Sequence, residues 1–219
     1  MLLVGTYFAT DSPRFQLRGT GFLVGDGRLV VTSAHVLPPR ASGGNAAALV
    51  VQVRKGNDEW EPRAVTTLGV DVARDLALLR MEGPPGPALT VGDSRVVQEG
   101  DALAFMGFPI GGLLGYSAVT HRAVVSSITT DLNAPFAEGA TAPSARVSRS
   151  DPLEIFQLDG TAYPGNSGGP LFHQQTGEVL GVMNMVLIKS TREAAMSQPS
   201  GISYAIPSRY VVELLARHR

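Results

Sequence analysis

Glu82-Gly83-Pro84-Pro85-Gly86-Pro87 is the densest cluster of proline and glycine in this chain of 219 residues. Because both residue types interrupt regular structure, we interpret the segment as a linker between two halves. Short runs rich in Val, Ile, Thr and aromatic residues precede it at Leu2–Thr10, Gly19–Val24, Leu29–Ser33, Leu49–Arg54, Glu61–Val70 and Leu76–Met81. A second series follows it at Ala102–Gly107, Ser117–Ile128, Ile155–Leu158, Pro170–His173, Val179–Val186 and Ser203–Ile206. Short runs separated by turn residues predict an all-β protein, a sandwich or a barrel, rather than an α/β fold.

One segment, residues 208–218, is predicted to be helical. Tyr210, Val211, Leu214 and Leu215 repeat there at helical spacing, and Ser208 is expected to cap the first turn. The chain is long enough for one large β domain or for two packed barrels around a cleft. The linker predicts two domains, residues 1–88 and residues 89–219.

The composition excludes several classes of function. The net charge is −1 and the 18 basic residues are scattered, so we expect no nucleic-acid partner. Cysteine is absent, which excludes a disulfide scaffold, a thiol nucleophile and a cysteine-based metal site. The four histidines are far apart and none has metal-binding spacing, so we expect neither a metal nor a cofactor.

The apolar runs also bear on the compartment. None approaches the about 18–20 residues that a membrane helix needs, so no membrane insertion is expected. The apolar start Met1–Val4 is too short for the core of a signal peptide. We expect a cytoplasmic protein if the chain is full-length, and a periplasmic or secreted one if it is a mature or trimmed fragment.

The segment Pro164-Gly165-Asn166-Ser167-Gly168-Gly169-Pro170-Leu171 carries the strongest chemical signal. A serine hydroxyl is a weak nucleophile and needs an unusual turn beside N–H groups that bind a developing oxyanion. The glycines allow such a turn, with the N–H groups of Gly165 and Ser167 directed at one point. A glycine-rich hairpin with an incidental serine is the alternative interpretation.

Two further segments supply partners for this serine. In Val30–Val36 a strand ends in small residues and then places His35, a residue type suited to general base work. In Arg74–Leu79 the acid Asp75 directly precedes an apolar strand. Burial of a carboxylate there without a polar partner would cost free energy of folding. Asp75 is placed to accept a hydrogen bond from Nδ1 of the histidine, and Asp71 is a competing candidate. Taken alone, each segment also fits a purely structural role.

The order histidine, aspartate, serine along the chain is that of the chymotrypsin arrangement. It puts His35 and Asp75 in the first half and Ser167 in the second, so the site is expected between the halves. An α/β-hydrolase also uses a Gly-x-Ser-x-Gly turn, but there an acid and then a histidine follow the serine. No Asp follows Ser167, His173 is too close and His218 is the penultimate residue, which excludes that class.

With these motifs the chain resembles the trypsin-like peptidases, and among them the bacterial HtrA/Deg-type group. The matching segments lie in order at Gly19–Val24, Val31–Val36, Arg74–Leu79, Val91–Ser94, Val97–Asp101, Gly107–Pro109, Gly165–Leu171 and Ile202–Ser208. The resemblance implies a chymotrypsin-like fold of two six-stranded antiparallel Greek-key barrels packed face to face, with a C-terminal helix. It implies a catalytic triad of Ser167, His35 and Asp75, and an oxyanion hole at Gly165, Asn166 and Ser167.

The chain departs from the HtrA/Deg-type pattern after the predicted helix, and from the digestive trypsins at Asn166. We expect no PDZ domain, because the chain stops at Arg219 just after the predicted helix, and the oligomeric state stays open. Asn166 stands where digestive trypsins have an aspartate that pairs with a freed N-terminus. An amide cannot form that ion pair, so activation by N-terminal cleavage is not expected. The loops Pro109–Gly115 and Asn133–Ser150 are expected to order the site instead.

The resemblance also implies a substrate pocket at Thr161 and Ala162, with Val186 and Leu187 as its opposite wall. Thr161 stands where trypsin has the aspartate that selects basic side chains, so we expect a preference for small or medium apolar residues. On the strand that leads to that wall, Asn184 is expected to hydrogen-bond Asp75.

The predicted function is therefore a serine endopeptidase that acts on proteins or peptides through an acyl-enzyme. The alternative is a latent or chaperone-like peptide-binding homologue that needs an activator. An esterase with the same mechanism would differ only in its substrate.

Overall fold

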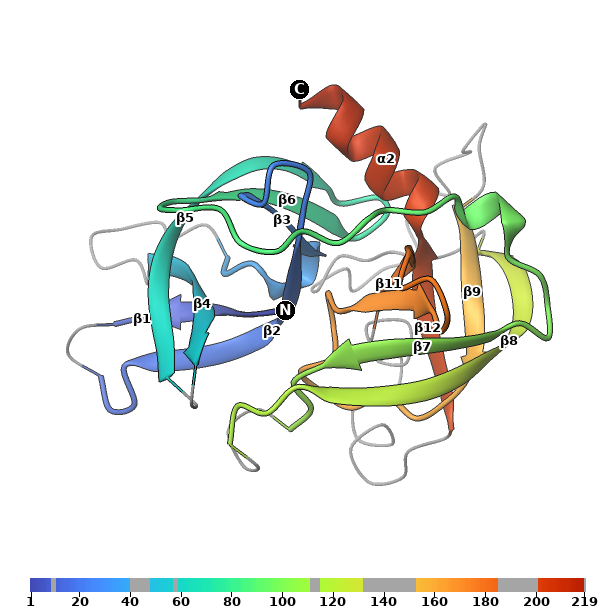
Figure 1. Ribbon diagram of the computed structural model, residues 1–219, viewed down its shortest axis with the longest axis horizontal. Helices are drawn as coiled ribbons and strands as arrows, with labels where there is room; N and C mark the ends of the chain where they lie inside the picture. Colours follow the sequence, from blue (N-terminus) through green and yellow to red (C-terminus); the bar gives the residue numbers. More distant parts are fainter. Residues whose placement is uncertain are drawn as a thin grey trace, which may run out of the picture.

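The computed structural model of the chain describes residues 1–8, 11–39, 48–56, 59–110, 115–131, 153–184 and 201–218. Within these ranges the strands form two closed barrels that lie side by side (Figure 1). Neighbouring strands of both barrels are antiparallel throughout. The predicted all-β, chymotrypsin-like fold is confirmed, while the domain division at residues 88 and 89 stays a prediction.

The first barrel closes in the order β1-β2-β3-β6-β5-β4. Its strands are β1 (Leu2–Tyr7), β2 (Phe15–Val24), β3 (Leu29–Ser33), β4 (Ala48–Gly56), β5 (Glu59–Asp71) and β6 (Leu76–Met81). The pairing of β3 with β6 skips two strands, which return to lie beside β1, and this arrangement is a Greek key.

The second barrel repeats that order as β7-β8-β9-β12-β11-β10. Its strands are β7 (Ala102–Gly107), β8 (Val119–Asp131), β9 (Leu153–Asp159), β10 (Pro170–His173), β11 (Val179–Asn184) and β12 (Ile202–Pro207). The repeat confirms two similar halves, which the two series of apolar runs predicted.

The strands at the junction of the barrels are apolar on both faces, because each face meets a different core. In β3, Val30 points into the core of the first barrel, whereas Val31 joins a core shared by both barrels. In β6, Leu79 likewise points into the core of the first barrel, and Leu78 joins the shared core. Side chains alternate between the faces of a strand, so a continuous apolar run serves both cores at once.

Helix α2 (Ser208–Arg217) covers the shared core (Figure 1). Tyr210, Val211 and Leu214 are buried against residues of both barrels, which confirms the helical spacing seen in the sequence. The cap prediction is wrong: Ser208 is the first residue of the helix, and its hydroxyl donates to the carbonyl of Gly92 at 2.7 Å. The described part of the chain contains no helix that is long and apolar enough to cross a membrane.

Candidate active site

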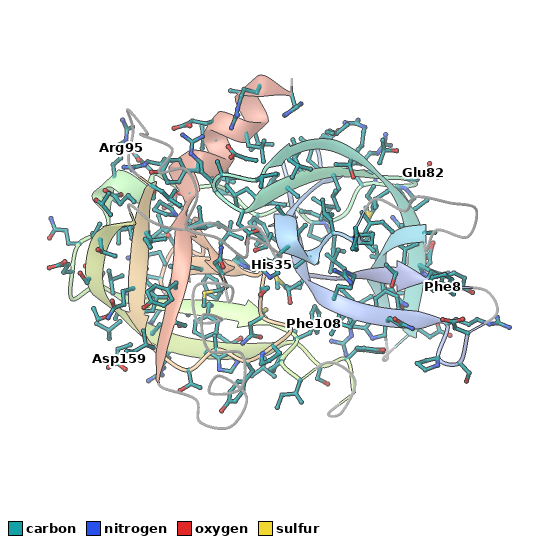
Figure 2. The ribbon with its side chains drawn as sticks, turned by 180° about the vertical axis from the view of Figure 1, so that it is seen from behind. Phe8, His35, Glu82, Arg95, Phe108 and Asp159 are labelled. Carbon is teal, nitrogen blue, oxygen red and sulfur yellow. The ribbon has the colours of Figure 1, made fainter. Side chains whose placement is uncertain are left out.

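His35 and Asp75 meet where two turns of the first barrel face the second barrel. His35 lies in the 3-10 turn Ala34–Val36 that follows β3, and Figure 2 shows it at the junction of the barrels. Asp75 ends the turn between β5 and β6 with a φ of +53°, a left-handed conformation that Asp tolerates better than most residues. Its carbonyl accepts a hydrogen bond from the N–H of Ala34 at 3.0 Å, so the backbone holds the two turns together.

The Asp75 carboxylate is 1% exposed and is surrounded by donors. It accepts hydrogen bonds from His35 Nδ1 at 2.6 Å, from His35 N–H at 2.8 Å and from Asn184 Nδ2 at 2.9 Å. The expected bond from Asn184 is therefore present. Because a carboxylate can only accept, the proton of the neutral imidazole lies on Nδ1 and the lone pair on Nε2. That tautomer is the one in which a histidine can take a proton from a nucleophile.

The competing acid, Asp71, has other partners. Its carboxylate accepts hydrogen bonds from Arg74 at 3.1 Å and from Arg217 of α2 at 2.8 Å. Burial raises the pKa of Asp71, but the hydrogen bonds from Arg217 and Arg74 outweigh it and hold the pKa below its usual range. Asp71 therefore holds α2 to the β5–β6 turn, whereas Asp75 binds the imidazole of His35.

The loop that carries Ser167 is fixed to both barrels through its backbone. The carbonyl of Ser167 accepts from the N–H of Thr20 in β2 at 2.8 Å, and the N–H of Gly168 donates to Met183 of β11 at 2.9 Å. The same Met183 carbonyl accepts from the hydroxyl of Ser33, which lies two residues before His35. These bonds bring Ser167 to the junction at which His35 and Asp75 meet.

Two N–H groups of this loop are available to a ligand. In the described part of the chain, the N–H groups of Gly165 and Ser167 donate to no protein acceptor. The N–H of Asn166 between them donates to the carbonyl of Tyr163 at 3.0 Å and so is occupied. Gly165 has a φ of +105°, a conformation that favours glycine. These two N–H groups are the ones that the sequence predicted as oxyanion donors, and that role stays a prediction.

Thr20 is a residue of the site that sequence reasoning missed. Its hydroxyl donates to the carbonyl of Gly165 at 2.6 Å and accepts from the N–H of Phe108 at 3.1 Å. One side chain of the first barrel thus fixes the orientation of a peptide group in the second. The threonine stood within a segment identified by its resemblance, but its partners lie 88 and 145 residues away.

The side chain of Asn166 is buried, and within the described part of the chain neither Nδ2 nor Oδ1 has a hydrogen-bond partner. Gly107 of β7 makes room for it, since a Cβ at that position would lie 2.6 Å from Oδ1. An unpaired buried amide costs about 1–3 kcal/mol for each group, so this position tolerates the neutral side chain only at some expense of stability.

Replacement of Asn166 by Asp is expected to lower the free energy of unfolding by about 3–4 kcal/mol at pH 7, because it buries an unpaired carboxyl. Burial raises the pKa of such a carboxyl above its unfolded value of about 3.9, so the folded variant binds the proton more tightly than the unfolded chain. The deficit relative to wild type should therefore be small near pH 4, grow by about 1.4 kcal/mol per pH unit up to the raised pKa of the folded variant, and stay constant above that pKa.

Urea unfolding of Asn166→Asp between pH 4 and pH 8 measures this effect. The control is Gln98→Glu, the same amide-to-acid change at an exposed position. A deficit that does not change with pH would contradict the prediction, since it would mean that the new carboxylate finds a cationic partner.

The structure describes half of the predicted substrate pocket. Thr161 and Ala162 follow β9, and Ala162 packs into the core of the second barrel. Val186 and Leu187 lie outside the described residues, as does the loop Asn133–Ser150. The two pocket residues that are described carry no charge.

His121 of β8 lies close to this region. Its ring stacks on Phe105 with centroids 4.7 Å apart, and it lies 6.2 Å from the ring of Tyr163. Burial lowers the pKa of His121, which favours the neutral imidazole. Over the described ranges, no cluster of three or more His, Asp or Glu side chains could hold a metal ion.

Comparison with known proteins shows the family of the chain. The family model described as "Trypsin-like peptidase domain" matches residues 19–182, a range that includes His35, Asp75 and Ser167. "Serine protease HTRA2, mitochondrial" of Bos taurus is 32% identical over 200 residues, which are 91% of this chain and 36% of that protein. "Probable periplasmic serine endoprotease DegP-like" of Halomonas elongata is 29% identical over 189 residues, 86% of this chain and 32% of that protein.

The likeness covers most of this chain and a part of each relative. The chain spans about a third of the length of these curated relatives. The resemblance to the HtrA/Deg-type group noted in the sequence is thereby confirmed for the barrels.

Proposed function

The chain belongs to the trypsin-like peptidase family, and on that premise we propose that it is a serine endopeptidase acting on proteins or peptides. Ser167 is the nucleophile, His35 the general base and Asp75 the carboxylate that orients the base. One observation carries the proposal: the buried Asp75 carboxylate accepts a hydrogen bond from Nδ1 of His35 at 2.6 Å, beside the loop that presents Ser167.

The proposed reaction proceeds in two stages, acylation and hydrolysis of the acyl-enzyme. Nε2 of His35 takes the proton of the Ser167 hydroxyl while the serine oxygen attacks the carbonyl carbon of the scissile bond. The oxyanion of the tetrahedral intermediate binds to the N–H groups of Gly165 and Ser167, with Asn166 between them. His35 then gives its proton to the departing amine, which leaves an acyl-enzyme. A water molecule, activated by the same histidine, hydrolyses the ester and restores Ser167.

The proposal includes a preference for small or medium apolar residues before the cleaved bond. Its support is that Thr161 and Ala162 are uncharged and that Ala162 is in contact with the apolar core of the second barrel. A charged residue of the substrate would find no opposite charge on these two side chains. Val186 and Leu187 complete the pocket in the proposal.

We expect a fluorophosphonate probe to label the wild-type protein and not Ser167→Ala, because the probe needs an activated serine. Casein should be digested by the wild type alone, with Val, Ala, Leu or Ile before the cleaved bonds when the fragments are identified by mass spectrometry. Ser126→Ala is the control, since this exposed serine belongs to β8 and should leave labelling unchanged.

Other outcomes separate the alternatives. A folded wild-type protein without labelling would support the latent or chaperone-like homologue that needs an activator. Labelling together with cleavage after Lys or Arg would keep the endopeptidase and overturn the proposed pocket.

A further inference from the structure

Arg18 lies beside the candidate active site and forms no ion pair with a carboxylate of the described residues. It belongs to β2, and its side chain is exposed. Its guanidinium instead donates to backbone carbonyls of the histidine turn. Nε donates to Val36 at 2.6 Å, and Nη2 lies 3.1 Å from the carbonyl of Leu37 and 3.5 Å from that of His35.

These bonds hold the positive charge in a fixed place. A free arginine side chain loses rotamer entropy when it binds a ligand, and this loss weakens most exposed ion pairs. Here the carbonyls of Val36 and Leu37 already restrain the guanidinium, so less entropy remains to be lost. The carbonyls satisfy hydrogen bonds but carry no full negative charge, and Arg18 therefore stays a net cation at the surface.

The contacts of the residues next to Arg18 show on which side of Ser167 its guanidinium lies. The next residue along β2, Gly19, lies between the two: a Cβ there would be 2.6 Å from Val36 Cγ2 and 2.8 Å from the carbonyl oxygen of Ser167. The residue after that, Thr20, binds Ser167 directly. The guanidinium thus lies on the His35 side of Ser167, on the surface of the first barrel.

The chemistry of the proposed function decides which part of a substrate passes there. His35 delivers its proton to the departing amine, so the residues that follow the scissile bond must lie on the histidine side of Ser167. This inference rests on the proposed function. We propose that Arg18 forms a cationic subsite that selects an acidic side chain among the first two residues after the scissile bond.

The test uses matched peptides with valine before the cleaved bond and Asp, Asn or Lys at the first or second position after it. Exposed ion pairs change affinity by about 1.5- to 5-fold, and in this comparison the attraction of Asp and the repulsion of Lys multiply. The wild type should therefore cleave the best Asp peptide about five to ten times faster, in kcat/KM, than its Lys counterpart. Arg18→Gln should reduce this ratio to less than about twofold, and Arg18→Lys should keep most of it. Raising the salt concentration should shrink the wild-type ratio in the same direction.

The ratio is taken between peptides within one enzyme, so a general effect of the substitution on His35 cancels. Arg14→Gln is the matched control, because it removes the same charge from an exposed position just before β2 and should leave the ratio unchanged. A wild-type ratio near one, or an equal ratio in Arg18→Gln, overturns the subsite while the endopeptidase stands. If the wild type cleaves no peptide and is not labelled by the fluorophosphonate, the proposed function fails and the subsite falls with it.

Discussion

Replacement of Asp75 by asparagine is expected to lower kcat/KM at neutral pH by about four orders of magnitude while the barrels stay folded. The carboxylate accepts bonds from both nitrogen donors of His35 and from Asn184. An amide offers one oxygen and one NH₂ group. An NH₂ group in place of Oδ2 would face two donors, His35 Nδ1 and Asn184 Nδ2, and one in place of Oδ1 would face the N–H of His35. An NH₂ group opposite Nδ1 favours the tautomer with the proton on Nε2, and in that tautomer the histidine cannot take a proton from Ser167.

The rates are measured on a valine-containing peptide, and urea unfolding reports the fold of each variant. Some stability should be lost as well, about 1–3 kcal/mol, because a buried donor is left without its acceptor. Asp71→Asn is the matched control: Asp71 is bonded to Arg74 and Arg217, so its replacement should weaken the attachment of α2 and leave most of the rate. Equal losses of rate in both variants would contradict the role proposed for Asp75.

Replacement of Gly165 by alanine is expected to lower kcat by about 10²–10³ with little change in KM. The backbone there has a φ of +105°, and an added Cβ would overlap the carbonyl oxygen of Phe108. The peptide group must move to relieve this overlap, and its N–H then leaves the position proposed for the oxyanion. Such an interaction exists only in the transition state, so its loss appears in kcat.

Gly177→Ala is the control for backbone strain alone. Gly177 also has a positive φ, +72°, but a Cβ there would meet no atom within 4 Å. Both variants should lose about 1–2 kcal/mol of stability from the left-handed backbone, whereas only Gly165→Ala should lose activity. If Gly165→Ala retained the wild-type kcat, its N–H could not be an oxyanion donor.

Sequence reasoning succeeded where the signal was local. Apolar runs between turn residues predicted the strands, and the spacing of Tyr210, Val211 and Leu214 predicted α2. The choice of Asp75 over Asp71 rested on its position directly before a buried strand; Asp75 does hydrogen-bond His35, and its catalytic role stays a prediction. These features depend on residues close together in the chain.

Sequence reasoning failed where the deciding partner is distant. Ser208 is a residue type that caps helices, but its hydroxyl donates instead to the carbonyl of Gly92, 116 residues earlier. Thr20 and Arg18 stand in ordinary strand positions, and their roles depend on which turns the closure of the first barrel brings next to β2. The unpaired amide of Asn166 was equally invisible, because its surroundings come from β2 and β7.

The core shared by the two barrels determines how the molecule responds to substitutions in its interior. Phe22, Val31 and Leu78 of the first barrel pack with Ile155, Val182 and Ile206 of the second and with α2 in one cluster. The linker at Glu82–Pro87 therefore connects the halves covalently, while the apolar contact sets their relative position. A substitution deep in this cluster is therefore expected to change how the two halves pack against each other, even though it lies far from the proposed site.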